Sequence, residues 1–252
     1  MFARTRRLAT LARSVSLLRA IRHEQSEPSL FYRPLAEDTA ALLDALLIDA
    51  TGTRLSGRSV LDVGGGPGYF ASAFAARDAW YVPVEPSVGE MAAAGITVPG
   101  SVRGDGRALP FRENTFDVVY SSNVAEHVPS PWDMAEEMLR VTRPGGLMIL
   151  SYTVWLGPFG GHETGLWEHY VGGEFARRRY ELRRGHPPKN VWGESLFAVS
   201  AAEGLRWARS ADADLLLAFP RYHPAWAWWL VRVPLLREFA VSNLVVVLRK
   251  RG

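Results

Sequence analysis

The sequence predicts a doubly wound α/β fold built on a mostly parallel sheet. Short apolar runs suited to buried strands alternate with helical stretches through residues 59–152. Such alternation is typical of parallel strands joined by crossover helices. The 252 residues, 48% of them hydrophobic and 22% charged, suffice for one large domain with a sizeable core. No apolar stretch reaches the roughly 20 residues that a membrane-spanning helix needs.

Residues 1–50 are expected to form a helical extension ahead of the domain. Before Glu24 the chain has no acidic residue, and apolar residues recur at a spacing of three to four, which predicts a basic amphipathic helix. Its arginines are Arg4, Arg6, Arg7, Arg13, Arg19 and Arg22. Its apolar stripe is Leu8, Leu11, Val15 and Leu18. A second helix is expected after Pro34, over residues 35–50.

Two roles for the basic helix stay open. It either packs across the domain or attaches the protein to anionic lipid through arginine and leucine. A secretory signal is not expected, because an apolar core and a small-residue cleavage site are missing, whereas a transit peptide stays an alternative. We therefore expect a cytoplasmic protein, with peripheral attachment to the inner face of the membrane as the further option.

Residues 51–252 are expected to form the α/β domain. A strand at 59–63 runs into a glycine-rich loop, a helix at 69–77 follows, and a strand at 80–84 comes next. The later elements predicted are a strand at 116–120, a helix at 134–141, a strand at 146–152, a helix at 200–209 and strands at 213–219 and 243–248.

Two insertions in this domain, 155–192 and 221–240, break the alternation. The first is rich in glycine, histidine, glutamate and arginine, and loops of that length are usually functional. The second carries Trp226, Trp228 and Trp229 in an apolar run too short to span a bilayer. Both insertions are expected to cover the acceptor, and the tryptophans alternatively rest at a membrane interface.

The clearest local signal is the glycine loop that follows the strand at 59–63. Asp62 comes just before Gly64, Gly66 and Gly68. Glycine at such a turn permits positive φ and lets a ligand approach the backbone closely. A dinucleotide fold would use G-x-G-x-x-G, whereas the spacing here is G-x-G-x-G. This spacing disfavours a nicotinamide-dependent oxidoreductase.

Two carboxylates follow the loop at informative positions. Glu85 ends the next strand, 17 residues after Gly68, and suits a carboxylate that accepts hydrogen bonds from both hydroxyls of a ribose. Asp105, which precedes Gly106, is placed to accept from an exocyclic amine such as adenine N6. The alternatives are that Glu85 caps the following helix and that Asp105 only forms a turn.

Five motifs in chain order resemble those of class I S-adenosylmethionine-dependent methyltransferases, in particular the type 11 group. They are LDVGGGPGYF, VEPS, GDGRALPF, FDVVYSSNVAEHV and EEMLRVTRPGGLMILSY. The chain also resembles uncharacterised actinomycete methyltransferases, but this resemblance gives no information about the reaction. The resemblance implies a seven-stranded Rossmann-like sheet, S-adenosylmethionine as cofactor and S-adenosylhomocysteine as product.

The resemblance also implies which residues contact the cofactor. Those expected at its methionine part are Gly64, Gly66 and Gly68. Asp62, just before them, is also expected to contribute to the cofactor site. Those expected at the ribose and adenine are Glu85, Asp105 and the backbone of Gly106. Those expected at the methionine amino and carboxylate groups, or at the transferring methyl, are Ser121, Ser122 and Asn123.

Three histidines are candidates for the catalytic base. A sulfonium methyl is already activated, so the enzyme mainly aligns the acceptor, but a hydroxyl or carbon nucleophile often also needs a base. The candidates are His127, His162 and His169, and the alternative role of His127 is to organise its loop. The order His162-Glu163…Glu168-His169 is not HExxH, so a zinc protease is rejected. No residue is assigned as a metal ligand, and metal assistance stays an alternative.

Residue types and motifs that the sequence lacks exclude several classes of acceptor. With no cysteine, the chain cannot form disulfides, iron–sulfur clusters or the nucleophile of cytosine C5 methylation. Nucleic acid is not expected either, because the Asn/Asp-Pro-Pro-Tyr/Phe motif of base methylation is absent near Ser121 and arginines do not interleave with aromatics. We expect a small or lipid-linked acceptor methylated at oxygen. The alternatives are quinone-type C-methylation and a non-catalytic S-adenosylmethionine-binding regulator or scaffold; the sequence does not determine the oligomeric state.

Overall fold

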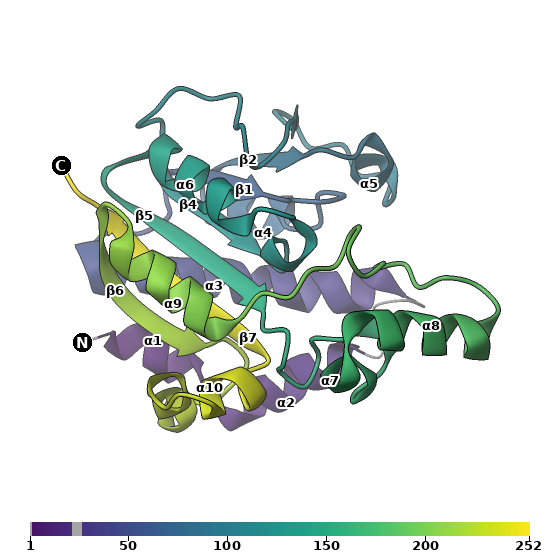
Figure 1. The fold of residues 1–252 in the computed structure, drawn as a ribbon. Coiled ribbons are helices and arrows are strands. Elements are labelled where there is room, and N and C mark those ends of the chain that lie inside the picture. The colour runs from purple at the N-terminus through teal and green to yellow at the C-terminus, as the bar shows by residue number, and fades with distance from the viewer. Residues whose placement is uncertain (1, 22–26) are drawn as a thin grey trace.

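A seven-stranded sheet forms the centre of the protein, whose computed structural model describes residues 2–21 and 27–252. The strand order is β3-β2-β1-β4-β5-β7-β6 (Figure 1). The strands from β3 to β5 run parallel, and β7 is antiparallel to both β5 and β6. The predicted fold class, a doubly wound and mostly parallel sheet, is therefore confirmed. The division into an extension and a domain stays a prediction.

The elements have the following bounds. The strands are β1 (Ser59–Val63), β2 (Trp80–Glu85), β3 (Val102–Arg103), β4 (Phe116–Ser122), β5 (Thr142–Thr153), β6 (Ala213–Pro220) and β7 (Asn243–Lys250). The α-helices are α1 (Ala3–Leu8), α2 (Leu11–Ala20), α3 (Pro28–Thr51), α4 (Ala71–Ala75), α5 (Val88–Ala92), α6 (Pro131–Val141), α7 (Glu168–Val171), α8 (Gly173–Arg184), α9 (Ala201–Ser210) and α10 (Leu236–Phe239). The 3-10 helices with bounds inside the described ranges are η2 (Ala125–His127), η3 (His162–Thr164) and η4 (Ala225–Arg232).

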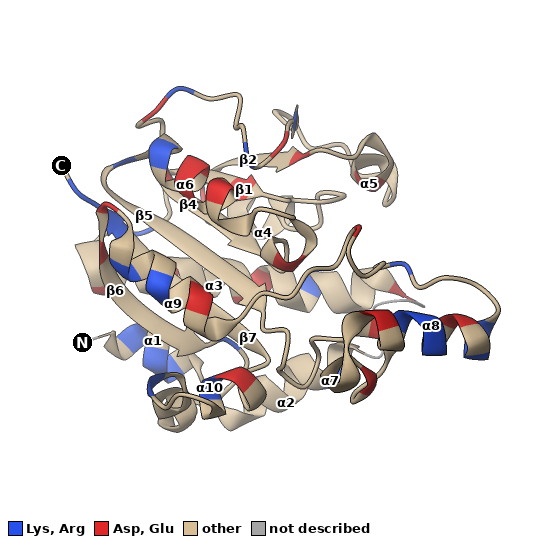
Figure 2. Ribbon diagram, viewed as in Figure 1, with Lys and Arg blue, Asp and Glu red and all other residues tan. Residues whose placement is uncertain are grey.

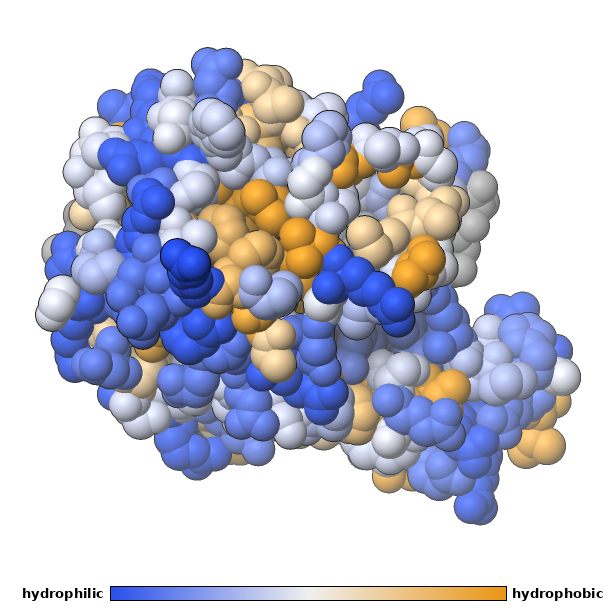
Figure 3. Space-filling model, turned by 90° about the horizontal axis from the view of Figure 1, so that it is seen from above, coloured by the Kyte–Doolittle hydropathy of each residue, from blue (hydrophilic) through white to orange (hydrophobic). Residues whose placement is uncertain are grey.

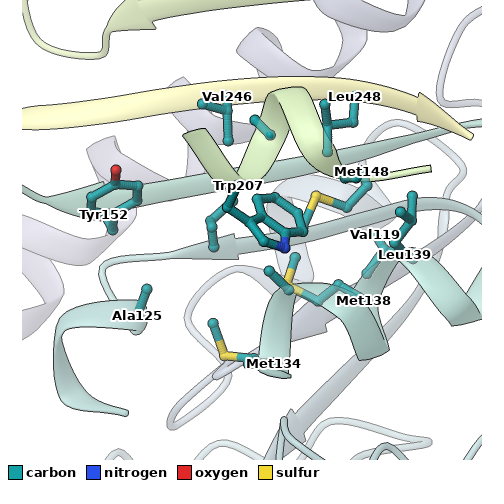
Figure 4. Packing of buried hydrophobic residues seen from close by; sticks show 14 of the residues in the cluster. Val119, Ala125, Met134, Met138, Leu139, Met148, Tyr152, Trp207, Val246 and Leu248 are labelled. Carbon is teal, nitrogen blue, oxygen red and sulfur yellow. The ribbon is translucent and has the colours of Figure 1, made fainter. Parts of the chain in front are cut away.

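Helices cover both faces of the sheet, and one core lies under α6 and α9. Figure 4 shows Met138 of α6 and Trp207 of α9 packed among strand residues that include Met148 and Leu248. All four side chains are at least nine-tenths buried. The indole nitrogen of Trp207 donates to Glu136 at 2.8 Å, so the one polar atom of this large ring is satisfied.

A second core lies on the opposite face, under α3 and α4. Leu43 and Leu46 of α3 join Phe74 of α4 in this core. Val118 belongs to it, whereas its neighbour Val119 belongs to the first core. Successive strand residues point to opposite faces, so a strand buried on both sides reads as a continuous apolar run.

The N-terminal segment forms two helices rather than the single predicted one. The break falls before Thr10, whose side chain caps α2 by accepting from the amide of Arg13 at 3.1 Å. The amide and hydroxyl of Thr5 in α1 donate to Asp49 of α3 at 2.9 and 2.8 Å. The segment therefore packs on the domain. Arg22 lies outside the described residues.

The helix predicted over residues 35–50 begins earlier, at Pro28, and the predicted start after Pro34 is wrong. Pro34 lies inside α3 even though a proline within a helix costs roughly 3 kcal/mol. The apolar face of α3, which includes Leu42, Leu43 and Leu46, is almost completely buried. Burial of that face offsets the lost hydrogen bond, which a local start signal does not reveal.

The insertion at 155–192 contains η3, α7 and α8, although its sequence lacks an apolar periodicity. The side chains of α8 pair along the helix: Arg177 contacts Glu174 at 2.7 Å and Glu181 at 2.5 Å. Spacings of three and four residues place such charges together on one turn. Figure 1 shows α8 extending away from the sheet, and Figure 2 shows basic (blue) and acidic (red) positions along its ribbon. Charge pairing therefore takes the place of a buried apolar stripe.

Within residues 2–21 and 27–252, no helix combines the length and the apolar composition required to cross a membrane.

Candidate functional site

The glycine loop leaves β1 at the carboxyl edge of the sheet. Gly64, Gly66 and Gly68 have φ values of 85°, 54° and 90°. A Cβ on Gly64 would lie 2.3 Å from Val124 Cγ2, and one on Gly68 would lie 2.5 Å from Val98 Cγ2. No atom of the described residues lies within 4 Å of the corresponding position on Gly66. The backbone at Gly66 is therefore the part of the loop that is open to a ligand.

Glu85 lies beside this open backbone. Its Oε2 accepts from the amide of Gly66 at 3.3 Å, and its Oε1 accepts from the amide of Ser87 at 3.1 Å. Burial raises the pKa of Glu85, while the two amide hydrogen bonds oppose that shift. Ser87 caps α5 by accepting from the amide of Glu90, so the alternative that Glu85 caps this helix is wrong. A carboxylate held at the loop fits a ribose diol.

Asp62 supports the loop from inside the sheet. Its Oδ2 accepts hydrogen bonds from the hydroxyls of Tyr81 at 2.5 Å and Tyr120 at 2.6 Å. Asp62 is 3% exposed, and burial raises its pKa to about 6, although both hydroxyls act in the opposite direction. Sequence reasoning missed the two tyrosines, which come from β2 and β4. Here the carboxylate joins three strands instead of facing an open position.

Asp105 and Gly106 follow β3. The Asp105 carboxylate accepts from Arg107 Nη2 at 2.7 Å and from the Arg107 amide at 2.9 Å, and these bonds hold the pKa of Asp105 below its ordinary value. An adenine amine would therefore compete with Arg107. A Cβ on Gly106 would lie 3.0 Å from side-chain atoms of Met134 and Val63. Close packing thus explains glycine at position 106.

The three residues expected at the methionine end occupy different environments. Ser121 is fully buried, and its hydroxyl donates to the carbonyl of Val63 at 2.8 Å, which ties β4 to β1. Asn123 has a positive φ of 56°, and its Oδ1 accepts from Asn243 Nδ2 at 2.7 Å. Ser122 lies between them at the end of β4. The cofactor contacts expected for all three residues stay predictions.

A buried arginine, which sequence reasoning missed, holds Ser122. Arg221 is 1% exposed, and its Nη1 donates to Ser122 Oγ at 2.5 Å and to Ser151 Oγ at 3.4 Å. Its Nη2 donates to Thr39 Oγ1 at 2.5 Å and lies 3.9 Å from Asp38. The only signal in the sequence was that Arg221 directly follows the apolar residues of β6. Arg221 connects α3 to the carboxyl ends of β4 and β5.

Two of the three candidate histidines come together beside a buried glutamate. The ring centroids of His127 and His162 are 5.0 Å apart at an interplanar angle of 78°. One nitrogen or oxygen atom from each of Glu126, His127 and His162 lies within 4.8 Å of the others. We call these three residues the histidine cluster. It lies where η2 follows β4, two residues after Val124, the residue that covers Gly64.

The backbone orients both rings. Nδ1 of His127 lies 2.7 Å from the carbonyl of Ser195, and Nδ1 of His162 lies 3.1 Å from the carbonyl of Gly160. A carbonyl only accepts, so each Nδ1 donates, and a neutral ring then carries its lone pair on Nε2. Burial lowers the pKa of His162, which favours the neutral form.

Glu126 is the member of the cluster that sequence reasoning did not select. It is 1% exposed, and its Oε1 accepts from the amide of Thr153 at 3.1 Å. Its Oε2 is buried and has no hydrogen-bond partner among the described residues. The signal available was an acidic residue next to a histidine after an apolar strand.

His169 lies outside this cluster. It is 1% exposed, its Nε2 donates to the carbonyl of Gly157 at 3.1 Å, and its ring packs edge-on to Trp155 with centroids 5.6 Å apart. Burial lowers the pKa of His169. Its surroundings are those of a packed side chain within the insertion, so its catalytic role stays a prediction without local support.

Comparison with known proteins identifies the family. A family model described as a methyltransferase domain matches residues 61–150. A Mycobacterium marinum protein named an uncharacterized methyltransferase is 61% identical over 249 residues, 97% of each chain. An S-adenosylmethionine-dependent methyltransferase structure from Mesorhizobium loti matches with a TM-score of 0.52 and 18% identity, covering 82% of this chain and 97% of that one. The chain belongs to the class I S-adenosylmethionine-dependent methyltransferases.

The fold of this methyltransferase also matches a Haloferax volcanii protein solved with the Trm112 methyltransferase activator. The TM-score is 0.54 at 17% identity, with 95% of this chain and 97% of that chain covered. At such identity the likeness concerns the fold alone. The fold implies use of S-adenosylmethionine, and the open backbone at Gly66 beside the Glu85 carboxylate fits that cofactor. These features lie where open α/β sheets bind ligands.

Proposed function

We propose that this methyltransferase methylates an oxygen atom of a small or lipid-linked acceptor. The observation that carries the proposal is the position of the histidine cluster. Val124 packs over Gly64 of the cofactor loop, and Glu126 and His127 follow it within three residues. An acceptor hydroxyl placed between the loop and the cluster would lie close to both the bound cofactor and the histidines.

S-adenosylmethionine supplies a methyl group that is already activated when it is bound. The chain then has three tasks: to hold the cofactor, to place the acceptor oxygen and to assist the loss of its proton. Glu85 and the Gly66 backbone are suited to the first task. The imidazole rings of His127 and His162, beside the buried carboxyl group of Glu126, are suited to the third task.

The experiment is methyl transfer over a panel of phenols, alcohols and extracted lipids, followed as S-adenosylhomocysteine release. We expect His127→Ala and His162→Ala each to lower transfer by about 100-fold or more, the range typical of lost proton-transfer assistance. Cofactor affinity should stay within a factor of about two. His186→Ala is the matched control, because His186 is exposed on the insertion. A labelled methyl recovered on carbon would contradict oxygen methylation.

A second observation favours an acceptor at a membrane surface. The apolar stripe of the N-terminal segment points outward: Leu11 and Leu18 are 59% and 53% exposed. The same segment packs on the domain through other residues, Phe2, Ala9 and Leu17, which are less than 9% exposed. Packing on the domain therefore leaves the predicted lipid-binding stripe free to meet another surface.

Further exposed apolar residues adjoin this stripe. The amide of Ala225, which begins η4, donates to the carbonyl of Ala9 at 2.8 Å, so η4 lies against the junction of α1 and α2. η4 leads directly into α10, where the amide of Arg237 donates to the carbonyl of Val233 at 3.1 Å. We define the apolar face by its exposed members, Leu11, Leu18, Trp226, Trp229, Leu235, Leu236 and Phe239. Extended exposed apolar surface marks interaction sites.

Basic residues lie on the same part of the chain as the apolar face. Figure 2 shows Lys or Arg positions in blue on the ribbon of α1 and beside α10. Those that are exposed are Arg4, Arg6, Arg7, Arg19 and Arg232. Tryptophan and arginine around an apolar patch is the composition expected of a segment lying in the interface of an anionic bilayer. The view from above in Figure 3 is mostly hydrophilic around a central hydrophobic patch, so exposed apolar residues also occur elsewhere.

A further inference from the structure

We propose that Glu126, His127 and His162 bind a divalent transition-metal ion of the zinc class. The role of that ion rests on the proposed function, whereas its binding does not. Two imidazoles and one carboxylate form a donor set that leaves coordination positions open for water or substrate in catalytic metal sites. The chain provides this set without cysteine.

The first supporting feature is the orientation of both rings. In metal sites the nitrogen that does not bind the ion usually donates to a carbonyl or carboxylate, which selects the tautomer. His127 and His162 make this contact with the carbonyls of Ser195 and Gly160. Each neutral ring therefore has its free lone pair on Nε2 before any ion arrives.

The second feature is the unsatisfied oxygen of Glu126. Oε1 is anchored by the Thr153 amide, whereas the buried Oε2 lacks a hydrogen-bond partner within the described part of the chain. Burying a carboxylate oxygen without a partner is costly. No arginine or lysine of the described residues forms an ion pair with Glu126. A cation in the cluster would remove this cost.

The third feature is the backbone that carries the ligands. Glu126 and His127 lie on η2 and His162 begins η3, so two loops meet at the cluster. His162 has a φ of 49°, a value that few residues other than glycine adopt and that often occurs at functional sites. Ligand bonds of about 2.0–2.2 Å place two donors roughly 3–4 Å apart. The donors, now within 4.8 Å, would close by about 1 Å through side-chain rotation.

With Nε2 of both rings bound to the ion, the ion and not an imidazole would assist the loss of the acceptor proton. At its open position it would bind the acceptor hydroxyl, lower the pKa of that group and release the proton to solvent water. The resulting oxyanion is the stronger nucleophile for the methyl group. This arrangement would explain why a buried carboxyl group without a partner lies beside two imidazole rings.

The experiment measures metal binding on the full chain after dialysis against a chelator. Calorimetry with Zn²⁺ should give one site per chain, and Co²⁺ should produce visible absorption bands typical of nitrogen and oxygen ligands. Glu126→Gln, His127→Gln and His162→Gln should each weaken Zn²⁺ binding at least about 100-fold. His186→Gln, at the exposed histidine, should leave it unchanged.

Circular dichroism and S-adenosylhomocysteine binding identify variants that fold. If Glu126→Gln does not fold, the two histidine variants carry the test. Absence of stoichiometric Zn²⁺ binding, or binding that all three variants retain, overturns the proposal. Should metal-free protein transfer methyl groups at the full rate and bind no Zn²⁺, the metal site is refuted while the proposed methyltransfer stands. Zn²⁺ binding that requires all three ligands supports the site even if no tested acceptor is methylated.

Discussion

The hydroxyl of Tyr120 lies 2.6 Å from the carboxylate of Asp62, inside the sheet and just below the glycine loop. Tyr81 donates to the same oxygen from β2, so one carboxylate joins β1, β2 and β4. Two phenol donors on one buried acceptor form a small network whose loss would leave Asp62 unsatisfied. The position of the loop therefore depends on a polar contact within the core.

Replacing Tyr120 by phenylalanine tests this network. Tyr120→Phe should lower the free energy of unfolding by about 1–3 kcal/mol, because a buried acceptor loses a donor without a change in shape. Chemical denaturation provides the measurement. Tyr180→Phe, on the charged helix α8, is the control and should change stability by less than about 0.5 kcal/mol. Equal effects of the two variants would contradict the role of the network.

The pKa of Asp62 predicts a pH dependence of stability. The pKa of Asp62 in the folded protein, about 6, lies above the ordinary aspartate value of 3.8, so the folded state binds the proton more tightly. This contribution is fully present below pH 3.8 and is lost as the pH rises through 6. The loss amounts to roughly 3 kcal/mol. Asp62→Asn should therefore become more stable relative to the parent between pH 4 and pH 7, as followed by denaturation at each pH. A constant difference would show that Asp62 does not titrate in this range.

Glu85 should determine affinity for the cofactor. Glu85→Ala is expected to weaken S-adenosylhomocysteine binding by roughly 1.5–3 kcal/mol for each charge-assisted hydrogen bond lost, less what water restores. Calorimetry on the folded variant measures this change. Glu90→Ala, an exposed acid on α5, is the matched control. An unchanged dissociation constant for Glu85→Ala would rule out the ribose contact.

His169 and His162 should respond differently to substitution. His169→Ala removes a buried ring packed on Trp155 and should lower the melting temperature and speed proteolysis of the insertion. His162→Ala should lower methyl transfer while cofactor affinity and melting temperature stay near those of the parent. Loss of transfer with unchanged stability in His169→Ala would instead restore His169 as a catalytic candidate.

The apolar face predicts binding to anionic membranes. Removing residues 1–23 would delete buried anchors such as Phe2 and Leu17, so a surface variant is the cleaner test. Leu11→Ser with Leu18→Ser should reduce cosedimentation with anionic liposomes at least about fivefold, since the exposed leucine area is lost. Leu182→Ser is the control, because Leu182 is 88% exposed on α8.

Salt and lipid charge distinguish the two parts of this attachment. Arginines near an anionic surface contribute about 1 kcal/mol each, and the attraction weakens as salt screens it. Binding should therefore fall with rising salt and be weaker on neutral liposomes. Binding indifferent to lipid charge and to the leucine substitutions would assign the apolar face to another partner.

The sequence by itself determined the fold, the family and the position of the cofactor loop. Strand–helix alternation, the glycines at 64, 66 and 68 and a carboxylate at the end of the next strand are local patterns. Each predicted feature depends on neighbours within a few residues, so periodicity and spacing were enough to find it. The spacing of Leu11 and Leu18 also predicted an apolar stripe on a helix. It did not reveal that this stripe faces solvent.

Only the tertiary structure decided how distant residues combine. Thirty-five positions separate His127 from His162, and 58 separate Asp62 from Tyr120, so neither pair leaves a periodic trace. Tertiary packing also carried α3 through Pro34 and stabilised the polar helix α8 by ion pairs. These outcomes depend on the balance between burial and local preference, and burial is defined only when the whole chain has packed.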